Sequence, residues 1–284
     1  MSTETGKKIA EEEKLRAKGE GAPHVTAKLR LFGASEDDVK VTFYRDHAAW
    51  CPYCQKVWMM LEEKKIPYRI ERINMRSYGD KPAWFLKKVP SGLLPVLELD
   101  GKMITESLVI MQILEQTFPE IPMIPEEHFD RANTLLRLER QLFSDWCGLV
   151  FRPSGPGPFG GGARKQFEET FDKVNEALGE LPGPWFLGGD TPSIVDLQYV
   201  SHVERMNASC LYWKGLQLRS TERWANVERW FAAFEERPCY MATKSDYYTH
   251  VMDIPPQYGP GYGDSSEAAK QAQLNIDGLS TWRL

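Results

Sequence analysis

The 284-residue sequence has few cysteines, and they form a sparse and odd-numbered set: Cys51, Cys54, Cys147, Cys210 and Cys239. Such a set excludes the dense disulfide framework of small secreted domains and favours a reducing compartment. Only Cys51 and Cys54 lie close together in the sequence, separated by two residues. In a reducing compartment, a pair with this spacing indicates redox or metal chemistry rather than a structural crosslink.

Long apolar runs and long basic runs are also missing. No stretch approaches the roughly 18 apolar residues that a membrane span needs, so we expect no membrane partner. A net charge of −5 without a basic cluster argues against nucleic acid as a partner. The first 21 residues are charged and rich in glutamate, which is typical neither of a secretory signal nor of a transit peptide. We therefore expect a cytoplasmic protein, or a plastid protein if a transit peptide has been removed.

The stretch Trp50-Cys51-Pro52-Tyr53-Cys54 is the strongest chemical signal in the chain. The alternation in residues 41–45 predicts a strand before it, and helical spacing of apolar residues predicts a helix after it, to about Lys65. Cys51 then falls near the helix N-cap, and Pro52 at the first helical position, where a missing N–H costs nothing. Free N–H groups and the helix dipole there favour the thiolate form of Cys51. Cys54 lies one turn further along, on the same face.

Residues 41–118 have the order β-α-β-α-β-β-α, which predicts an α/β unit with a mixed sheet. The three later strands are residues 68–73 and the two arms of a hairpin within 92–104 that turns at Asp100-Gly101. A short aromatic helix at 82–88 and a helix at 106–118 complete the unit.

The second half of the chain has a weak strand signal and strong helical periodicity. It predicts an all-helical domain with helices at 133–151, 164–181, 193–206 and 224–236, the third opened by a Ser193/Asp196 capping box. The expected organisation is a polar extension (1–38), an α/β domain (39–118), a proline-rich linker (119–125), a helical domain (126–240) and a C-terminal extension (241–284) that ends in a short helix near 266–275.

Five motifs, in this order, resemble the glutathione transferase superfamily: Cys51-Pro-Tyr-Cys54, Lys81-Pro-Ala-Trp-Phe85, Gly92-Leu-Leu-Pro-Val-Leu97, Glu106-Ser107 and Thr191-Pro-Ser-Ile-Val-Asp196. The second and third look most like the cysteine-type omega and lambda classes. The thiol motif is glutaredoxin-like, and a two-cysteine motif on this scaffold is similar to the iota class. The resemblance implies a thioredoxin-like N-terminal domain followed by an all-α C-terminal domain.

The resemblance also implies roles for the two thiols. Cys51 would be the nucleophile that forms a mixed disulfide with glutathione. Cys54 would be either the resolving thiol or a small core residue that never reacts. A metal half-site is the competing interpretation. A structural zinc site needs four ligands, and neither the other cysteines nor the histidines have the spacing of zinc ligands. We therefore expect no metal. An iron–sulfur cluster shared across a dimer with glutathione as co-ligand is a minor alternative.

Further residues are implied to bind glutathione. Pro95 would be cis, with the Leu94 backbone pairing with the cysteine of glutathione. Ser107 and the helix N-terminus would receive the γ-glutamyl carboxylate, Glu106 its ammonium group, and Lys81 the glycine carboxylate. Each has a structural alternative: a proline that opens a strand, polar residues that begin a helix, and a surface lysine.

The predicted site also includes an acceptor pocket lined by aromatic side chains. Among the aromatic residues we select Tyr53, Trp146 and Tyr199, although aromatic side chains at helical spacing mostly pack into cores.

The sequence therefore predicts a glutathione-dependent thiol transferase or reductase that removes glutathione from a small-molecule or protein thiol/disulfide acceptor. Two alternatives remain open: conjugation of glutathione to electrophiles, for which Tyr44 and Tyr53 could supply a hydroxyl, and a non-catalytic binding or scaffold protein of the same fold. Many members of the superfamily dimerise, so a homodimer is one option for the assembly.

Overall fold

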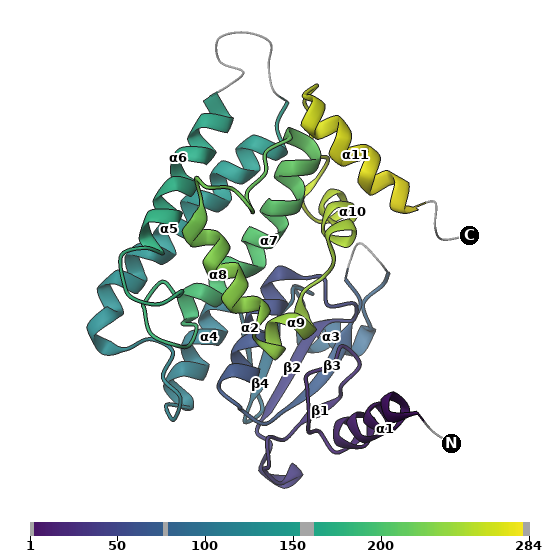
Figure 1. Cartoon of the computed structure of the whole chain (residues 1–284). Coiled ribbons are helices and arrows are strands. Elements are labelled where there is room, and N and C mark those ends of the chain that lie inside the picture. Colours follow the sequence, from purple (N-terminus) through teal and green to yellow (C-terminus); the bar gives the residue numbers. More distant parts are fainter. Residues whose placement is uncertain (1–2, 76–78, 154–161, 281–284) are drawn as a thin grey trace. The chain divides into compact units, whose positions relative to one another are not determined.

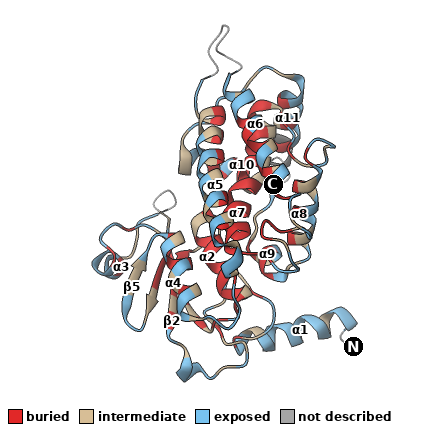
Figure 2. Cartoon of the chain, turned by 90° about the vertical axis from the view of Figure 1, so that its left-hand side faces the viewer, coloured by how far each residue is buried: buried red, intermediate tan, exposed pale blue. Residues whose placement is uncertain are grey.

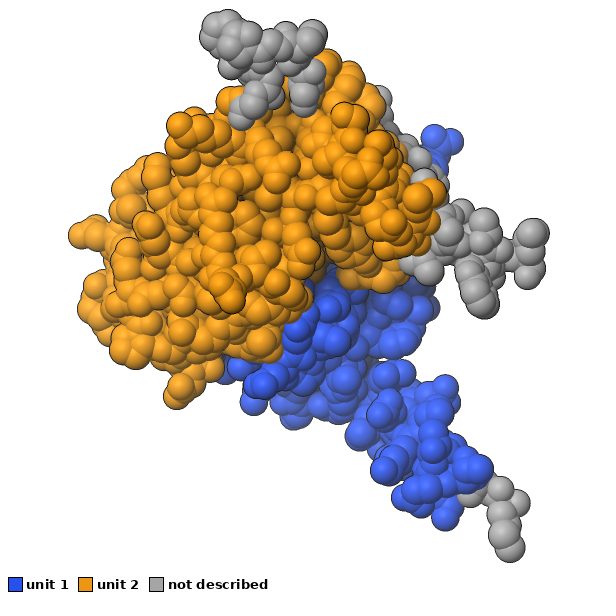
Figure 3. Space-filling view, turned by 45° about the horizontal axis from the view of Figure 1, so that its top comes forward, with its two compact units in different colours: residues 1–123, 235–244 blue, residues 124–234, 245–284 orange. Residues whose placement is uncertain are grey.

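The computed structural model describes residues 3–75, 79–153 and 162–280, with side chains up to residue 276. The chain divides into two compact units, coloured separately in Figure 3. Unit 1 consists of residues 1–123 and 235–244, and unit 2 consists of residues 124–234 and 245–284. Both units therefore contain segments that are distant in the sequence.

Unit 1 is built on a five-stranded sheet with the order β1-β3-β2-β4-β5. Strands β2 and β3 are parallel and are connected through helix α2, whereas the other neighbouring pairs are antiparallel. The strands are β1 (Leu29–Arg30), β2 (Val41–Asp46), β3 (Tyr68–Ile73), β4 (Val96–Leu99) and β5 (Lys102–Thr105). The predicted mixed α/β sheet is confirmed, with one strand more than the sequence indicated.

Helix α2 (Pro52–Glu63) is almost wholly buried, as Figure 2 shows. Two helices of unit 1 contact it, α4 (Ser107–Thr117) and α9 (Pro238–Thr243). The connection to α9 is polar, because Glu63 of α2 accepts hydrogen bonds from Arg237 and from the Cys239 thiol. Unit 1 also contains α1 (Glu4–Ala17), the short η1 (Glu36–Asp38) and α3 (Ala83–Lys88).

The first 38 residues contact the core of unit 1 through strand β1 and through the Val25 carbonyl, which accepts a hydrogen bond from buried Arg45. Helix α1 has no buried residue, as expected from its polar sequence. Strand β1, in contrast, pairs with β3 at the edge of the sheet. Its Arg30 is buried and donates to both carboxylate oxygens of Glu62 at 2.8 and 2.9 Å, while the Tyr68 hydroxyl donates to the same carboxylate at 2.7 Å. This segment therefore contributes a strand and a buried ion pair.

Unit 2 is helical and is organised around α7 (Ile194–Lys214), which contacts α5, α10 and α11 and is buried on all sides. The predicted capping box is present, with Ser193 and Asp196 each accepting a hydrogen bond from the other's backbone N–H. The other elements are η3 (Glu126–His128), α5 (Phe129–Val150), α6 (Gly162–Ala177), α8 (Ala225–Glu235), α10 (Tyr247–Tyr258) and α11 (Glu267–Ser280) (Figure 1). The predicted helical second half is confirmed.

Residues 241–280 are largely helical. They form α10 and α11 and part of α9, and α10 and α11 both pack on α7. Val251, Ile254 and Ala269 have at most 1% of their surface exposed. Within the described residues, no helix is both long and apolar enough to cross a membrane.

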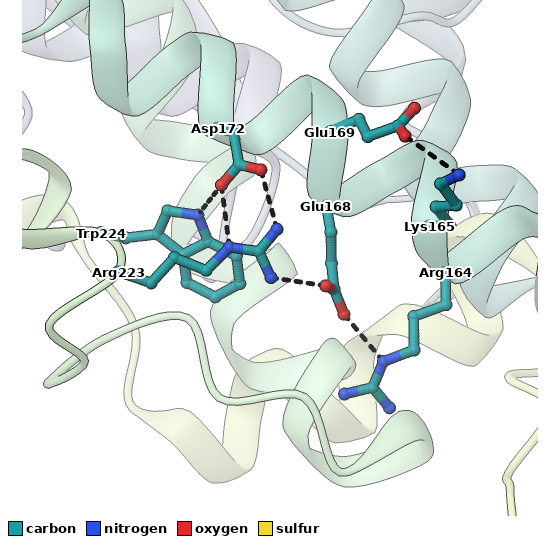
Figure 4. A network of polar contacts seen from close by, with 7 residues as sticks. All are labelled: Arg164, Lys165, Glu168, Glu169, Asp172, Arg223 and Trp224. Carbon is teal, nitrogen blue, oxygen red and sulfur yellow. Dashed lines mark hydrogen bonds and ion pairs between the residues drawn. The ribbon is translucent and has the colours of Figure 1, made fainter.

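A polar network links α6 to the turn before α8 in unit 2 (Figure 4). The Arg223 guanidinium donates to both Asp172 oxygens at 2.9 and 2.7 Å and to Glu168 at 2.6 Å. The Trp224 indole N–H donates to Asp172 at 2.8 Å. These contacts hold the start of α8 against α6.

Candidate active site

The candidate residues of unit 1 converge at one end of the sheet. Because β2 is parallel to β3 and antiparallel to β4, the C-terminal ends of β2 and β3 meet the start of β4 and the end of β5. The register pairs Asp46 with Ile73, and Val96 with both Tyr44 and Thr105. The thiol motif, Lys81 and Glu106-Ser107 lie on segments that leave the sheet at this end, and Leu94-Pro95 lies on the segment that enters it there.

The turn that presents the thiols is held by the last residue of β2. The Asp46 carboxylate accepts a hydrogen bond from the Trp50 backbone N–H at 2.6 Å. Cys51 is the N-cap residue of α2, with extended backbone angles (φ −71°, ψ 117°), and Pro52 occupies the first turn. No side chain caps this helix end, so its free N–H groups remain directed toward the Cys51 side of the turn. The predicted placement of the motif on a strand-to-helix turn is confirmed.

Both thiols are buried, and Cys51 keeps 6% of its surface exposed. Cys54 is the more deeply buried of the two. It is 1% exposed, and its sulfur hydrogen-bonds with the Cys51 thiol and with the Asp46 backbone. Burial raises the pKa of Cys54 well above its ordinary value, and the neighbouring Cys51 and the Asp46 charge raise it further. Both cysteines are free in this structure, and the raised pKa favours the protonated form of Cys54.

Lys81 lies close to the thiol pair. Its ammonium group donates to the Asn74 carbonyl at 2.7 Å. Burial lowers the pKa of Lys81, while the charges of Cys54, Cys51 and Asp46 oppose that shift. The Lys81 ammonium group is therefore close enough to interact electrostatically with both sulfurs.

Leu94 and Pro95 are joined by a cis peptide bond, as the resemblance implied. Glu106 and Ser107 lie at the N-terminus of α4. Glu106 is exposed, has positive φ (66°) and does not cap the helix with its side chain, so its carboxylate stays available. Backbone outliers of this kind cluster at ligand sites, and free N–H groups in the first turn can receive a carboxylate.

The three acceptor-pocket candidates fall in different places. Tyr53 is half-buried in the first turn of α2. Trp146 and Tyr199 belong to unit 2, are 0% exposed and make internal hydrogen bonds to Ser209 and the Leu135 carbonyl. These two side chains are core groups of unit 2 in this structure, and neither is open to a substrate.

Tyr44 is not placed to activate a sulfur. Its hydroxyl donates to Glu98 at 2.6 Å and accepts from Lys88 at 3.1 Å. Burial and the hydrogen bond to Glu98 raise the pKa of Tyr44. A tyrosinate at this position is therefore disfavoured.

Two charged residues beside the thiols were not among the sequence candidates. Arg45 and Asp46 are both 0% exposed although they end an otherwise apolar strand. Two adjacent residues of opposite charge, at the end of the strand that precedes the thiol motif, were the available signal. In the described part of the chain, no three His, Cys, Asp or Glu side chains gather as metal ligands would.

Comparison with known proteins agrees with this architecture. Residues 50–117 match the model of the glutathione S-transferase N-terminal domain, and residues 126–233 match that of the C-terminal domain. Mouse glutathione S-transferase omega-1 is 30% identical over 71% of this chain and 80% of its own length. Glutathione S-transferase DHAR2 of Arabidopsis thaliana is 28% identical over 69% of this chain and 84% of its own.

A solved structure supports the same family assignment. Glutathione transferase Omega 3C from Trametes versicolor superposes with a TM-score of 0.61 at 27% identity, covering 73% of this chain and 90% of its own. The chain therefore belongs to the glutathione S-transferase family, a family of enzymes. Both the predicted superfamily and the predicted fold are confirmed.

Proposed function

We propose that the protein is a glutathione-dependent thiol transferase that removes glutathione from mixed disulfides. The observation that carries the proposal is the position of Cys51 at the uncapped N-terminus of α2. Free N–H groups and a helix dipole at such an end are features that activate cysteine nucleophiles in proteins. A cysteine at this position acts as a nucleophile, whereas conjugation needs a hydroxyl that stabilises the glutathione thiolate without reacting.

Glutathione would bind along the end of the sheet. Its γ-glutamyl carboxylate meets the N-terminus of α4 at Ser107, and its ammonium group pairs with Glu106. The backbone of Leu94 pairs with its cysteine, and Lys81 neutralises its glycine carboxylate. This arrangement holds the glutathione sulfur against Cys51, so the reaction between the two sulfurs becomes effectively intramolecular.

The reaction consists of two exchanges. The Cys51 thiolate attacks the glutathione sulfur of a mixed disulfide, and the acceptor leaves as a thiol after taking a proton. The Cys51–glutathione disulfide is then resolved, either by a second glutathione, which departs as oxidised glutathione, or by Cys54. The names of the omega-1 and DHAR2 relatives support a glutathione-dependent enzyme. The Tyr44 hydroxyl already donates its hydrogen bond to Glu98, which argues against a role for it in conjugation.

Single cysteine variants test the proposal. Cys51→Ser should lower the rate of hydroxyethyl disulfide reduction by at least about 100-fold, because the nucleophile is lost. Cys54→Ser should retain most of the turnover with glutathione as the resolving thiol. A parallel chlorodinitrobenzene assay on the same preparations measures conjugation. Full reduction by Cys51→Ser, or conjugation much faster than reduction in the wild type, would contradict the proposed chemistry.

A further inference from the structure

Unit 1 contains a cavity of about 450 Å³ between helix α1 and the segment that leads into β1. This volume lies within the range of small-molecule sites in proteins. Its polar lining residues are Glu13, Arg16, His24, Thr26 and Lys28. All of them precede the stretch 50–117 that matches the family's N-terminal domain, so the cavity is a feature of this chain's own first residues.

The segment that forms one wall of the cavity is attached to the sheet on both sides of His24. Before His24, the Gly21 carbonyl accepts a hydrogen bond from the buried Arg30 guanidinium at 2.8 Å. After His24, the Lys28 carbonyl accepts from the Ile70 N–H of β3 at 2.9 Å. The wall is therefore fixed by the fold itself, and a ligand would meet a site that is already formed.

The orientation of the His24 ring is also fixed. The Thr26 backbone N–H donates to His24 Nδ1 at 3.2 Å, and the Thr26 hydroxyl lies 2.6 Å from the same nitrogen. Because Nδ1 accepts the backbone hydrogen bond, the proton of the neutral ring lies on Nε2. The half-buried His24 is thus prepared to donate a hydrogen bond from Nε2.

Arg16 lines the same cavity from α1. Its Nη2 lies 3.4 Å from Glu12, whereas its buried Nε–H has no hydrogen-bond partner among the described residues. Burial lowers the pKa of His24, and the positive charge of Arg16 lowers it further. The guanidinium is therefore close enough to the imidazole to oppose its protonation, and an anion between the two would remove that repulsion.

We propose that this cavity binds a phosphate group, as free phosphate or as the monoester of a small hydroxylated molecule. The Arg16 guanidinium, the His24 Nε2–H and the Lys28 ammonium supply donors on three side chains. A phosphate group presents three or more oxygens to them, whereas a carboxylate presents two. Glu13, the remaining charged group of the lining, can accept a hydrogen bond from a hydroxyl of an ester.

The pKa of His24 supplies a test on the wild-type protein. Histidine resonances of the full chain are followed by NMR across pH, with and without saturating inorganic phosphate at constant ionic strength, and His24→Asn identifies the His24 signal. Bound phosphate should raise the pKa of His24 by about one pH unit or more, because an anion stabilises the imidazolium. His128 does not line the cavity and should not respond. An unchanged pKa of His24 would overturn the proposal, whether or not any variant folds.

Matched variants of α1 test the donor set. Isothermal titration calorimetry should give a dissociation constant of about 1 mM for inorganic phosphate and the wild type, the weak affinity expected of a small ion. Arg16→Gln should weaken binding by about tenfold or more through the loss of a charge-assisted hydrogen bond. Lys14→Gln removes an exposed charge of the same helix that does not line the cavity, and should stay within about twofold of wild type. Equal weakening in both variants would show general attraction to α1 and would overturn the site.

Glycerol 3-phosphate distinguishes the two sources of the phosphate group. If it binds more tightly than inorganic phosphate, and Glu13→Gln abolishes that preference, the site takes a hydroxylated ester. Equal affinities in the wild type assign the site to free phosphate, and saturable binding of neither compound overturns the proposal. None of these measurements uses the thiols, so their outcome is independent of the proposed function.

Discussion

At the scale of single residues, the two thiols of unit 1 are neighbours with unequal surroundings. Cys51 lies at the uncapped N-terminus of α2 and is 6% exposed. Cys54 lies inside, against Asp46, where burial raises its pKa. The sulfur at the helix end is suited to the first attack on a substrate, whereas burial disfavours the thiolate form of Cys54. Position within a single helical turn therefore separates the proposed roles.

Lys81 permits a prediction about binding. Lys81→Met should raise the KM for glutathione by about tenfold or more, because a charge-assisted hydrogen bond to the glycine carboxylate contributes about 1.5–3 kcal/mol. The kcat should change much less, since Lys81 is not proposed to touch the reacting sulfurs. Steady-state kinetics with varied glutathione measures both constants. Lys87→Met, at an exposed position of α3, is the control. An unchanged KM in Lys81→Met would show that Lys81 does not bind glutathione.

At the scale of elements, β1 is a two-residue strand attached by a buried ion pair. In Arg30→Met, the Glu62 carboxylate would lose its buried partner, so the free energy of unfolding should fall by about 3–5 kcal/mol. Arg69→Met removes an exposed pair with Glu36 and should cost no more than about 1 kcal/mol. Urea denaturation followed by circular dichroism measures both.

The double variant Arg30→Met/Glu62→Met tests the reason for that loss. With both charges removed, much of the stability should return, because the loss arises from a buried unpaired carboxylate. Equal losses in the single and double variants would show that packing of the Arg30 side chain, rather than charge, attaches β1.

The polar network between α6 and α8 should make the free energy of unfolding depend on pH. Hydrogen bonds from Arg223 lower the pKa of Asp172 below its usual value. Because the folded-state pKa is lower than the unfolded one, the pair stabilises the fold above about pH 4, and this contribution is lost as the pH falls through the folded-state pKa.

Asp172→Asn should therefore lower the free energy of unfolding at pH 7 by less than about 1 kcal/mol, since both side chains are partly exposed. Below about pH 3 the difference from wild type should shrink. Urea denaturation across this pH range provides the measurement. Glu169→Gln removes the neighbouring pair with Lys165 (Figure 4) and serves as a surface control. A difference that does not depend on pH would contradict the assigned pKa shift.

The elements that sequence reasoning predicted well are those with a regular apolar period, such as α2 and α5. Helix α7 extends to Lys214, about two turns beyond the predicted end, because a helix buried on every face has no period to read. Strand β1 is too short to carry a pattern and exists through pairing with a distant strand. Helix α10 was missed because Pro255 and Pro256 lie in its last turn.

The candidate site also has features that the sequence predicts and features that it does not. The position of Cys51 and the cis bond before Pro95 could be predicted from local sequence and family likeness. The burial of Arg45 and Asp46 follows from how β2 lies between β3 and β4, which no local pattern states. Burial of Trp146 and Tyr199 likewise depends on helices that pack together from distant parts of the chain.

At the scale of the whole molecule, the C-terminal residues belong to the core of unit 2. Ile254 on α10 is 1% exposed, whereas Leu274 on α11 is 69% exposed. Ile254→Ala should lower the free energy of unfolding by about 2–5 kcal/mol through lost burial and a cavity. Leu274→Ala should change it by no more than about 0.5 kcal/mol. Equal and small effects in urea denaturation would mean that this segment is only loosely attached.

Residues 235–244 belong to unit 1 although they follow the first stretch of unit 2, residues 124–234, in the chain. On a ribosome, α9 emerges only after that entire stretch has been synthesised. Until then, Glu63 lacks Arg237 and Cys239, and the face of α2 that receives α9 stays uncovered. The unit that carries the thiols therefore cannot mature as an independent N-terminal module during translation, and a chain that stops at residue 123 would release it incomplete.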